Sequence, residues 1–198
     1  MNKTGSKGTK GTKGTKGTLP DLLPDGATRV LFVGINPGMR SAELGHHYAG
    51  PGNGFWTLVT EARLTPEPVT FVDDRRMPGW GYGLTNIVAR ATPGVADLTP
   101  AELRAGASRL LTLLDGVRPR VLAPVGVTVW RALLEALGIP GARATPVPLG
   151  WQDMRLGPSR VFVLPNPSGR NAHVSRDEMR RTFQRLGRAV RTKASPRP

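Results

Sequence analysis

Cysteine is absent from this chain, and its absence excludes several kinds of site. Without thiols the chain can form no disulfide, no iron–sulfur cluster and no thiolate zinc site. It has only three histidines, and the adjacent pair His46 and His47 does not easily converge with further ligands on one ion. We therefore expect no metal and no other cofactor.

Long apolar runs are missing as well. No stretch approaches the roughly 18 apolar residues of a membrane span, and the N-terminus lacks the apolar segment of a signal peptide. We expect no membrane contact and a cytoplasmic location. The 198 residues suit one domain with a sizeable core, which we expect to be a monomer.

Acidic residues are scarce beside basic ones, because 14 Asp and Glu face 28 Lys and Arg, a net charge of +14. Five of these charges are lysines within the first 16 residues and three lie after residue 190, so the body keeps +6. Such an excess favours a polyanionic partner, because neutralised phosphates release counterions. A GC-rich genome that encodes much arginine would give the same excess without that partner.

Residues 7–18 are four copies of Lys-Gly-Thr, and a repeat without apolar side chains predicts disorder. This tail is either a nonspecific nucleic-acid tether or a solvated end of no specific function. We expect the disordered tail to span 1–18, one globular domain to span 19–190, and a basic tail to span 191–198.

Apolar runs and helical stripes alternate along the globular part. We expect strands at 29–34, 120–125 and 160–165, and helices at about 54–63 and 127–138. Two more helices are expected after the capping boxes Thr99-Pro100-Ala101-Glu102 and Ser175-Arg176-Asp177-Glu178. This alternation predicts an α/β domain of three layers, α/β/α, around a mainly parallel central sheet with right-handed crossovers.

Two polar turns follow apolar strands: Gly34-Ile35-Asn36-Pro37-Gly38 and Asn166-Pro167-Ser168-Gly169. Ligands of open α/β sheets bind beyond the carboxyl ends of the strands, so both turns can face one crevice. The first turn lacks the third glycine of a dinucleotide fingerprint, and Pro37 removes a backbone N–H that could hold a phosphate. The second lacks the aromatic residue of the Asn-Pro-Pro-Tyr motif of amino-methyltransferases.

A third unusual segment runs from Gly45 to Trp56. Its glycines and Pro51 confine an irregular backbone directly after Tyr48, so this loop can form the wall of a flat pocket. Phe55 and Trp56 begin a helix and are expected in the core.

In this order, the first turn, the Gly45–Trp56 segment, the stretch Gly83–Gly94 and the second turn resemble the mismatch-specific uracil-DNA glycosylase and thymine-DNA glycosylase family, bacterial type. The resemblance covers nearly the whole globular part. It implies a uracil-DNA glycosylase-like fold and a monofunctional, cofactor-free enzyme of base excision repair, associated with the nucleoid. Such an enzyme flips uracil, or thymine or another damaged pyrimidine, out of double-stranded DNA with G:U or G:T mismatches and leaves an abasic site.

The resemblance also implies roles for single residues. Asn36 would position the attacking water, and backbone N–H groups near Ile35 would stabilise the charge that develops on the departing pyrimidine. Tyr48 would stack on the flipped base, Asn86 would face the pyrimidine edge, and Thr92 would line the pocket near the 5-position. Efficient relatives carry aspartate where Asn36 stands, and iron–sulfur relatives need four cysteines, so a slower, mismatch-directed enzyme is implied.

The second turn resembles the loop that such enzymes insert into the minor groove. Arg170 falls at the wedge position, where it would fill the gap and read its polar edges, which puts a strict dependence on guanine in doubt. The DNA-contacting residues implied in this loop are Asn166, Ser168, Gly169, Arg170, Asn171 and His173.

Asp73 and Asp74 offer an alternative to Asn36. If their loop folds back towards the pocket, one carboxylate could act as a general base and widen the substrate range. Otherwise they pair with Arg75 or Arg76, or are solvated. Two other functions stay open: a non-catalytic basic α/β domain that binds nucleic acid, and a small-molecule hydrolase or nucleotide-binding enzyme.

Overall fold

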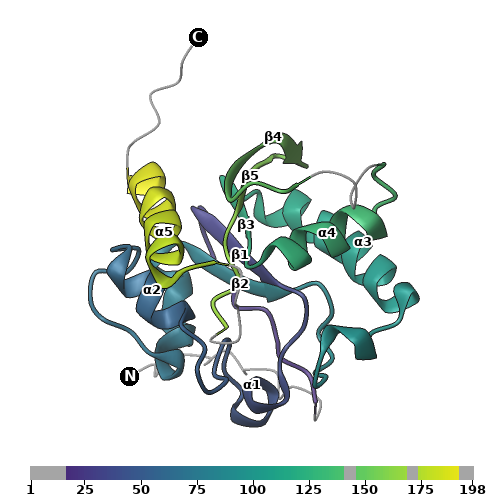
Figure 1. Cartoon of the computed structure of the whole chain (residues 1–198), viewed down its shortest axis with the longest axis horizontal. Helices are drawn as coiled ribbons and strands as arrows, with labels where there is room; N and C mark the ends of the chain where they lie inside the picture. Colours follow the sequence, from purple (N-terminus) through teal and green to yellow (C-terminus); the bar gives the residue numbers. More distant parts are fainter. Residues whose placement is uncertain (1–16, 141–145, 169–173, 192–198) are drawn as a thin grey trace, which may run out of the picture.

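A five-stranded sheet lies at the centre of the computed structural model, which describes residues 17–140, 146–168 and 174–191 (Figure 1). The strands are β1 (Val30–Gly34), β2 (Tyr82–Asn86), β3 (Val121–Pro124), β4 (Gly150–Leu156) and β5 (Ser159–Val163). Their order is β2-β1-β3-β5-β4. Only β4 runs antiparallel to its neighbour, so the prediction of a mainly parallel sheet is confirmed.

Helices cover both faces of the sheet, as Figure 1 shows. The helices α2 (Phe55–Glu61) and α5 (Arg176–Arg191) lie on one face, and α3 (Pro100–Val117) and α4 (Val127–Ala136) lie on the other. The short helix α1 (Met39–Leu44) follows β1, and 3₁₀ turns form η1 (Phe71–Trp80) and η2 (Val95–Asp97). The predicted three-layer α/β/α fold is therefore confirmed.

The apolar run of β1 supplies both halves of the core. Val30 and Phe32 pack with α2 and α5, whereas Leu31 and Val33 pack with α3 and α4, because successive side chains of a strand point to opposite faces. All five residues of β1 are buried. A strand that is covered on both faces reads as a continuous apolar run, which is why β1 could be recognised from the sequence.

The predicted strands correspond to β1, β3 and β5, and the predicted helices to α2, α4, α3 and α5, with small shifts at their ends. Both predicted caps form: the Thr99 hydroxyl accepts from the Glu102 N–H at 3.2 Å, and the Ser175 hydroxyl accepts from the Glu178 N–H at 3.2 Å. The strands β2 and β4 were not predicted. The sequence of β2, Tyr-Gly-Leu-Thr-Asn, has no apolar run, yet all of it is buried.

The chain before β1 explains the burial of β2, since it covers that outer edge of the sheet. Leu22 exchanges backbone hydrogen bonds of 2.9 and 2.8 Å with Leu84 of β2. Further back, the Leu19 N–H donates to Ala89 at 3.2 Å, and the Ala91 N–H donates to Gly17 at 2.7 Å. We call residues 17–22 the N-terminal strap. It pairs with a strand edge that would otherwise be open.

Close packing of α3 against the chain after β2 depends on Gly106. A Cβ at this position would lie 2.2 Å from the carbonyl oxygen of Ile87. Gly116, on the same helix, has open space around the same point. The two glycines therefore differ in packing while sharing a helical backbone.

Gly106→Ala should lower the free energy of unfolding by roughly 1–3 kcal/mol, because the added methyl group forces α3 away from Ile87. Gly116→Ala is the matched control and should leave stability unchanged or raise it by up to about 1 kcal/mol, the usual gain of alanine over glycine in a helix. Urea unfolding followed by circular dichroism measures both. Equal stability of the two variants would contradict the close contact.

Candidate active site

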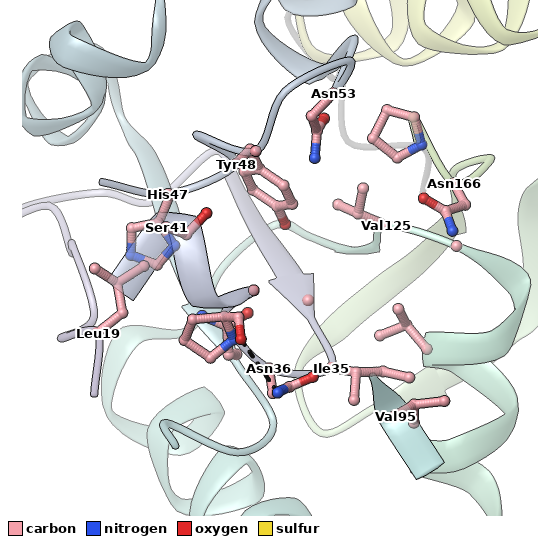
Figure 2. A pocket seen from close by; sticks show the side chains of 18 of the residues that line it. Leu19, Ile35, Asn36, Ser41, His47, Tyr48, Asn53, Val95, Val125 and Asn166 are labelled. Carbon is pink, nitrogen blue, oxygen red and sulfur yellow. Dashed lines mark hydrogen bonds between the residues drawn. The ribbon is translucent and has the colours of Figure 1, made fainter. Parts of the chain in front are cut away.

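A cavity of about 420 Å³ opens at the carboxyl ends of the parallel strands. The turn Gly34–Gly38 after β1, Asn86 at the end of β2, Val125–Gly126 after β3 and Asn166–Pro167 after β5 all line it. Figure 2 shows Ile35 and Asn36 on one side of the cavity, with Tyr48 and Asn53 opposite them. The prediction that the two polar turns face one crevice is thus confirmed.

Asn36 is held by its amide nitrogen. Its Nδ2 donates to the hydroxyl of Thr92 at 2.7 Å and also lies 3.2 Å from the carbonyl oxygens of Pro37 and Arg90. Within the described part of the chain, its Oδ1 has no hydrogen-bond partner. The side chain therefore presents an acceptor and not a donor to whatever enters the cavity.

Thr92 helps to fix the orientation of this amide, together with the carbonyls of Pro37 and Arg90. Its hydroxyl donates to the carbonyl of Gly94 at 2.6 Å, so its only proton is used and its oxygen can only accept from Asn36. Thr92 is buried and is not among the residues that line this cavity, although it was expected in the pocket wall. Its hydroxyl instead accepts a hydrogen bond from the Asn36 amide outside the cavity.

The loop that carries Thr92 is anchored to α3. The Arg90 guanidinium donates to Glu102 from Nε at 2.7 Å and from Nη2 at 3.0 Å, and Nη2 also reaches the Asp97 carbonyl at 3.1 Å. The hydrogen bonds from Arg90 and from the backbone of Thr99 lower the pKa of the Glu102 carboxyl to about 2. Glu102 is therefore charged at neutral pH and can pair with Arg90. This pair links to α3 the loop that carries the Arg90 carbonyl and the Thr92 hydroxyl, both of which accept from Asn36.

Tyr48 forms the aromatic wall of the cavity. Its backbone adopts the left-handed conformation, with φ of 55°, and its ring stacks on Phe55 at 4.0 Å between ring centres. The hydroxyl is buried and finds no hydrogen-bond partner among the described residues. Burial raises the pKa of this phenol well above its usual range, so the hydroxyl keeps its proton.

Gly34 allows Tyr48 and Asn86 to converge. A Cβ on Gly34 would lie 2.4 Å from Oδ1 of Asn86 and 3.6 Å from the hydroxyl oxygen of Tyr48. Only glycine leaves room for the Asn86 amide at this point. The structure therefore brings together, around one cavity, Ile35, Asn36, Tyr48 and Asn86 of the predicted catalytic and base-pocket residues, and Asn166 of the predicted DNA-contacting residues.

Asn86 is braced from outside the cavity by groups that the sequence did not indicate. The Arg109 guanidinium donates to the Asn86 carbonyl, and it donates to Asp21 of the N-terminal strap at 2.6 Å. The Thr85 hydroxyl donates to the other oxygen of Asp21 at 2.6 Å. Residues this far apart in the chain leave no local pattern from which such a network can be read.

His47 and Leu19 were also missed as cavity residues, although His47 was recognised within its motif. The His47 Nε2 donates to the Pro20 carbonyl at 3.0 Å, and a carbonyl can only accept, so this nitrogen carries the proton. Burial lowers the pKa of the imidazole, which keeps it neutral. This contact holds the N-terminal strap against the cavity, with Leu19 as part of the wall (Figure 2).

Neither of the two aspartates lines the cavity. Asp74 is completely buried, accepts from the His47 backbone N–H at 2.8 Å and lies 2.9 Å from Nδ1 of His46. Asp73 caps η1 by accepting from the Thr70 N–H at 2.9 Å, and it pairs with Arg76 at 3.3 Å. This arrangement gives no support to an aspartate general base, and the ion pair expected as the alternative is present.

The second polar turn borders the cavity beside α2. The Gly54 N–H donates to Pro167 at 2.8 Å, and the Ser168 N–H donates to Oδ1 of Asn166 at 3.1 Å. Of the residues expected to contact DNA, Asn166 and Ser168 are described here. Gly169, Arg170, Asn171 and His173 lie outside the described residues.

The described ranges contain no group of three or more His, Asp and Glu side chains arranged to hold a metal ion. In the same ranges, no helix combines the length and the apolar character needed to cross a membrane. The polar side chains that line the cavity are amides, the hydroxyls of Ser41 and Thr128, a phenol and a neutral imidazole.

The chain is similar to known proteins of one family. The model of the uracil DNA glycosylase superfamily matches residues 20–187. The G/U mismatch-specific uracil DNA glycosylase of Schizosaccharomyces pombe is 33% identical over 171 residues, which cover 85% of this chain and 52% of that protein. The chain therefore spans about half the length of this curated relative.

A similar fold is seen in the solution NMR structure of a candidate uracil DNA glycosylase from Methanosarcina acetivorans. The TM-score is 0.54 at 20% identity, and the match covers 86% of this chain and 98% of that one. The family model spans both polar turns and every described residue of the cavity except Leu19. On these grounds the chain belongs to the uracil DNA glycosylase superfamily.

Proposed function

We propose that this protein hydrolyses the bond between uracil and deoxyribose in mismatched duplex DNA and leaves an abasic site. The observation that carries the proposal is the fixed orientation of Asn36, whose Oδ1 faces a cavity walled by Tyr48 and Asn86. The name of the fission yeast relative supports a G:U mismatch as the substrate. The same site would accept other pyrimidines to the extent that they fit this wall.

Binding of the base must precede the reaction. A nucleotide flipped from the stack would place its base between Tyr48 and Asn86. The Asn86 amide offers both a donor and an acceptor, which matches the alternating groups along the edge of uracil. Because Arg109 and Gly34 fix this residue from two sides, little reorganisation would be needed when the base enters.

Bond cleavage would then use Asn36 and the backbone beside it. The Asn36 Oδ1 would accept a hydrogen bond from water and hold its oxygen below the sugar carbon, C1′. As the bond from C1′ to the base breaks, its electron pair leaves with uracil, and N–H groups near Ile35 would stabilise that charge. Water supplies the new C1′–O bond, and the proton it loses balances the one that uracil gains. An amide is a weak base, so a modest rate is expected.

Asn36→Ala should lower the single-turnover rate of uracil release from a G:U duplex on the order of 100-fold or more, because the water loses its orienting acceptor. Binding of the duplex should change by no more than a few-fold. Free uracil is quantified by chromatography, and binding by fluorescence anisotropy. Full activity in this variant would refute the role of Asn36. No base release by the wild-type protein from any uracil duplex would favour the purely DNA-binding alternative.

Thr92→Val should also slow base release, by roughly 10-fold, since the isosteric side chain can no longer accept from Asn36. The amide then loses the shortest of the three contacts that hold its orientation. The control is Thr92→Ser, which keeps the hydroxyl and should keep most of the rate. The affinity for DNA should stay the same in both variants. If valine and serine give equal rates, Thr92 does not position Asn36.

Tyr48→Phe should separate the role of the hydroxyl from that of the aromatic ring. The hydroxyl is buried without a partner among the described residues, so its removal should leave the free energy of unfolding unchanged or raise it. A base in the cavity does not reach a buried atom, so kcat/KM should also change by less than about 2-fold. Tyr48→Leu removes the aromatic face as well and should lower kcat/KM by about 5-fold to 10-fold. An equal loss in both variants would show that the hydroxyl contacts the base.

A further inference from the structure

Two more cavities continue from the active site onto α5. The first, about 450 Å³, shares the walls Asn53 and Pro167 with the active-site cavity and reaches Ser168 and Arg176. The second, about 400 Å³, also begins at Arg176. We call the two together the α5 groove, lined by Gly52, Asn53, Gly54, Thr57, Leu58, Glu61, Pro167, Ser168, Val174, Ser175, Arg176, Asp177, Met179, Arg180 and Arg181.

The charge of this groove is positive. The helix α5 carries six arginines and only two acidic residues. Within the groove, Arg180 is paired with Asp177 at 2.9 Å. Arg176 and Arg181 are both exposed and form no ion pair or hydrogen bond with the described residues. Besides Asp177, the acidic side chain that lines the groove is Glu61. Two guanidinium groups are thus available to an anion from solution.

The helix that presents these arginines is firmly held. Its inner face buries Met179, Phe183 and Leu186 in the core. A Cβ on Gly187 would lie 2.2 Å from the Ala62 carbonyl, so α5 packs directly against the end of α2. The Arg191 guanidinium donates to that same carbonyl at 2.8 Å. The exposed arginines therefore project from a rigid support, which lowers the entropic cost of binding a ligand.

We propose that the α5 groove binds backbone phosphates of the DNA strand that carries the flipped nucleotide, a proposal that rests on the proposed function. Arginine suits this task, because its planar guanidinium makes paired hydrogen bonds to phosphate oxygens. The strand is assigned by continuity. Asn53 and Pro167 form a common wall, so a chain that leaves the active-site cavity past this wall enters the groove.

The test compares two variants that each lose two exposed arginines. Arg176→Ala/Arg181→Ala removes the unpaired charges of the groove. Arg118→Asn/Arg120→Ala removes two just before β3, at the end of the strands opposite the cavity. Asparagine tolerates the left-handed backbone of Arg118. Unfolding in urea confirms that both variants are folded. The ligand is a duplex with a G:U mismatch whose uridine carries a 2′-fluorine, which slows cleavage during the measurement.

The groove variant should bind this duplex roughly 10-fold more weakly than wild type at about 100 mM KCl. Its plot of log K against log salt concentration should be shallower by about 1.8, since each lost phosphate contact removes about 0.9 from the slope. The control variant should match the wild type in affinity and slope. Arg176→Lys/Arg181→Lys keeps both positive charges and should therefore recover most of the salt dependence of the wild type. If the groove and control variants bind alike, the proposal is overturned.

Neutral methylphosphonates then identify the strand. Placed on the uridine strand beside the flipped nucleotide, one at a time, they should weaken binding by the wild type but add little to the loss in the groove variant. Placed on the complementary strand, they should affect both proteins equally. If only methylphosphonates on the complementary strand distinguished the wild type from the groove variant, the assignment of the groove to the uridine strand would be overturned. Wild-type protein that shows these phosphate contacts but releases no uracil would refute the proposed function and leave the groove intact.

Discussion

Backbone pairing between two segments, 34–37 and 86–92, is the constraint on which the site depends. The parallel register places Gly34 beside Asn86, and pairing continues past the strand ends, because the Ile87 N–H donates to Gly34 at 2.9 Å and the Val88 N–H to Ile35 at 2.8 Å. This pairing carries Thr92 to Asn36. Asn86 in the cavity wall and the Asn36 amide are thereby fixed by the same set of hydrogen bonds, so a shift of register would displace both.

The elements that could be predicted are those whose residue types depend directly on their own burial or their own hydrogen bonds. A strand buried on both faces, such as β1, must be apolar throughout, and a helix start such as Thr99 must satisfy its own N–H groups. The strand β2 could not be found in this way, because the N-terminal strap buries it from a distance. Within β2, Asn86 lines the cavity and Thr85 donates to Asp21. These polar residues interrupt the apolar run by which a buried strand is recognised.

The candidate site shows the same division. Motifs predicted which residue types gather, and Asn36, Tyr48 and Asn86 do line one cavity. They did not predict which atoms face which, since that depends on hydrogen-bond direction. Thr92 was expected in the pocket wall, and it instead accepts a hydrogen bond from Asn36. Asp74 shows that a position close to a motif in the sequence does not reveal what a carboxylate contacts. It accepts from the His47 backbone N–H and lies beside the His46 ring, so it holds the loop of these two histidines.

The distribution of arginine bears on the origin of the basic charge. A coding bias alone would scatter arginine without regard to the site. Here six arginines lie on α5, and the first of them lines a cavity that shares Asn53 and Pro167 with the cavity of the candidate site. Elsewhere arginines are used within the structure, as Arg90 is with Glu102 and Arg109 with Asp21. Arg176 and Arg181 have no such internal task among the described residues, so binding of a polyanion explains their position better than composition does.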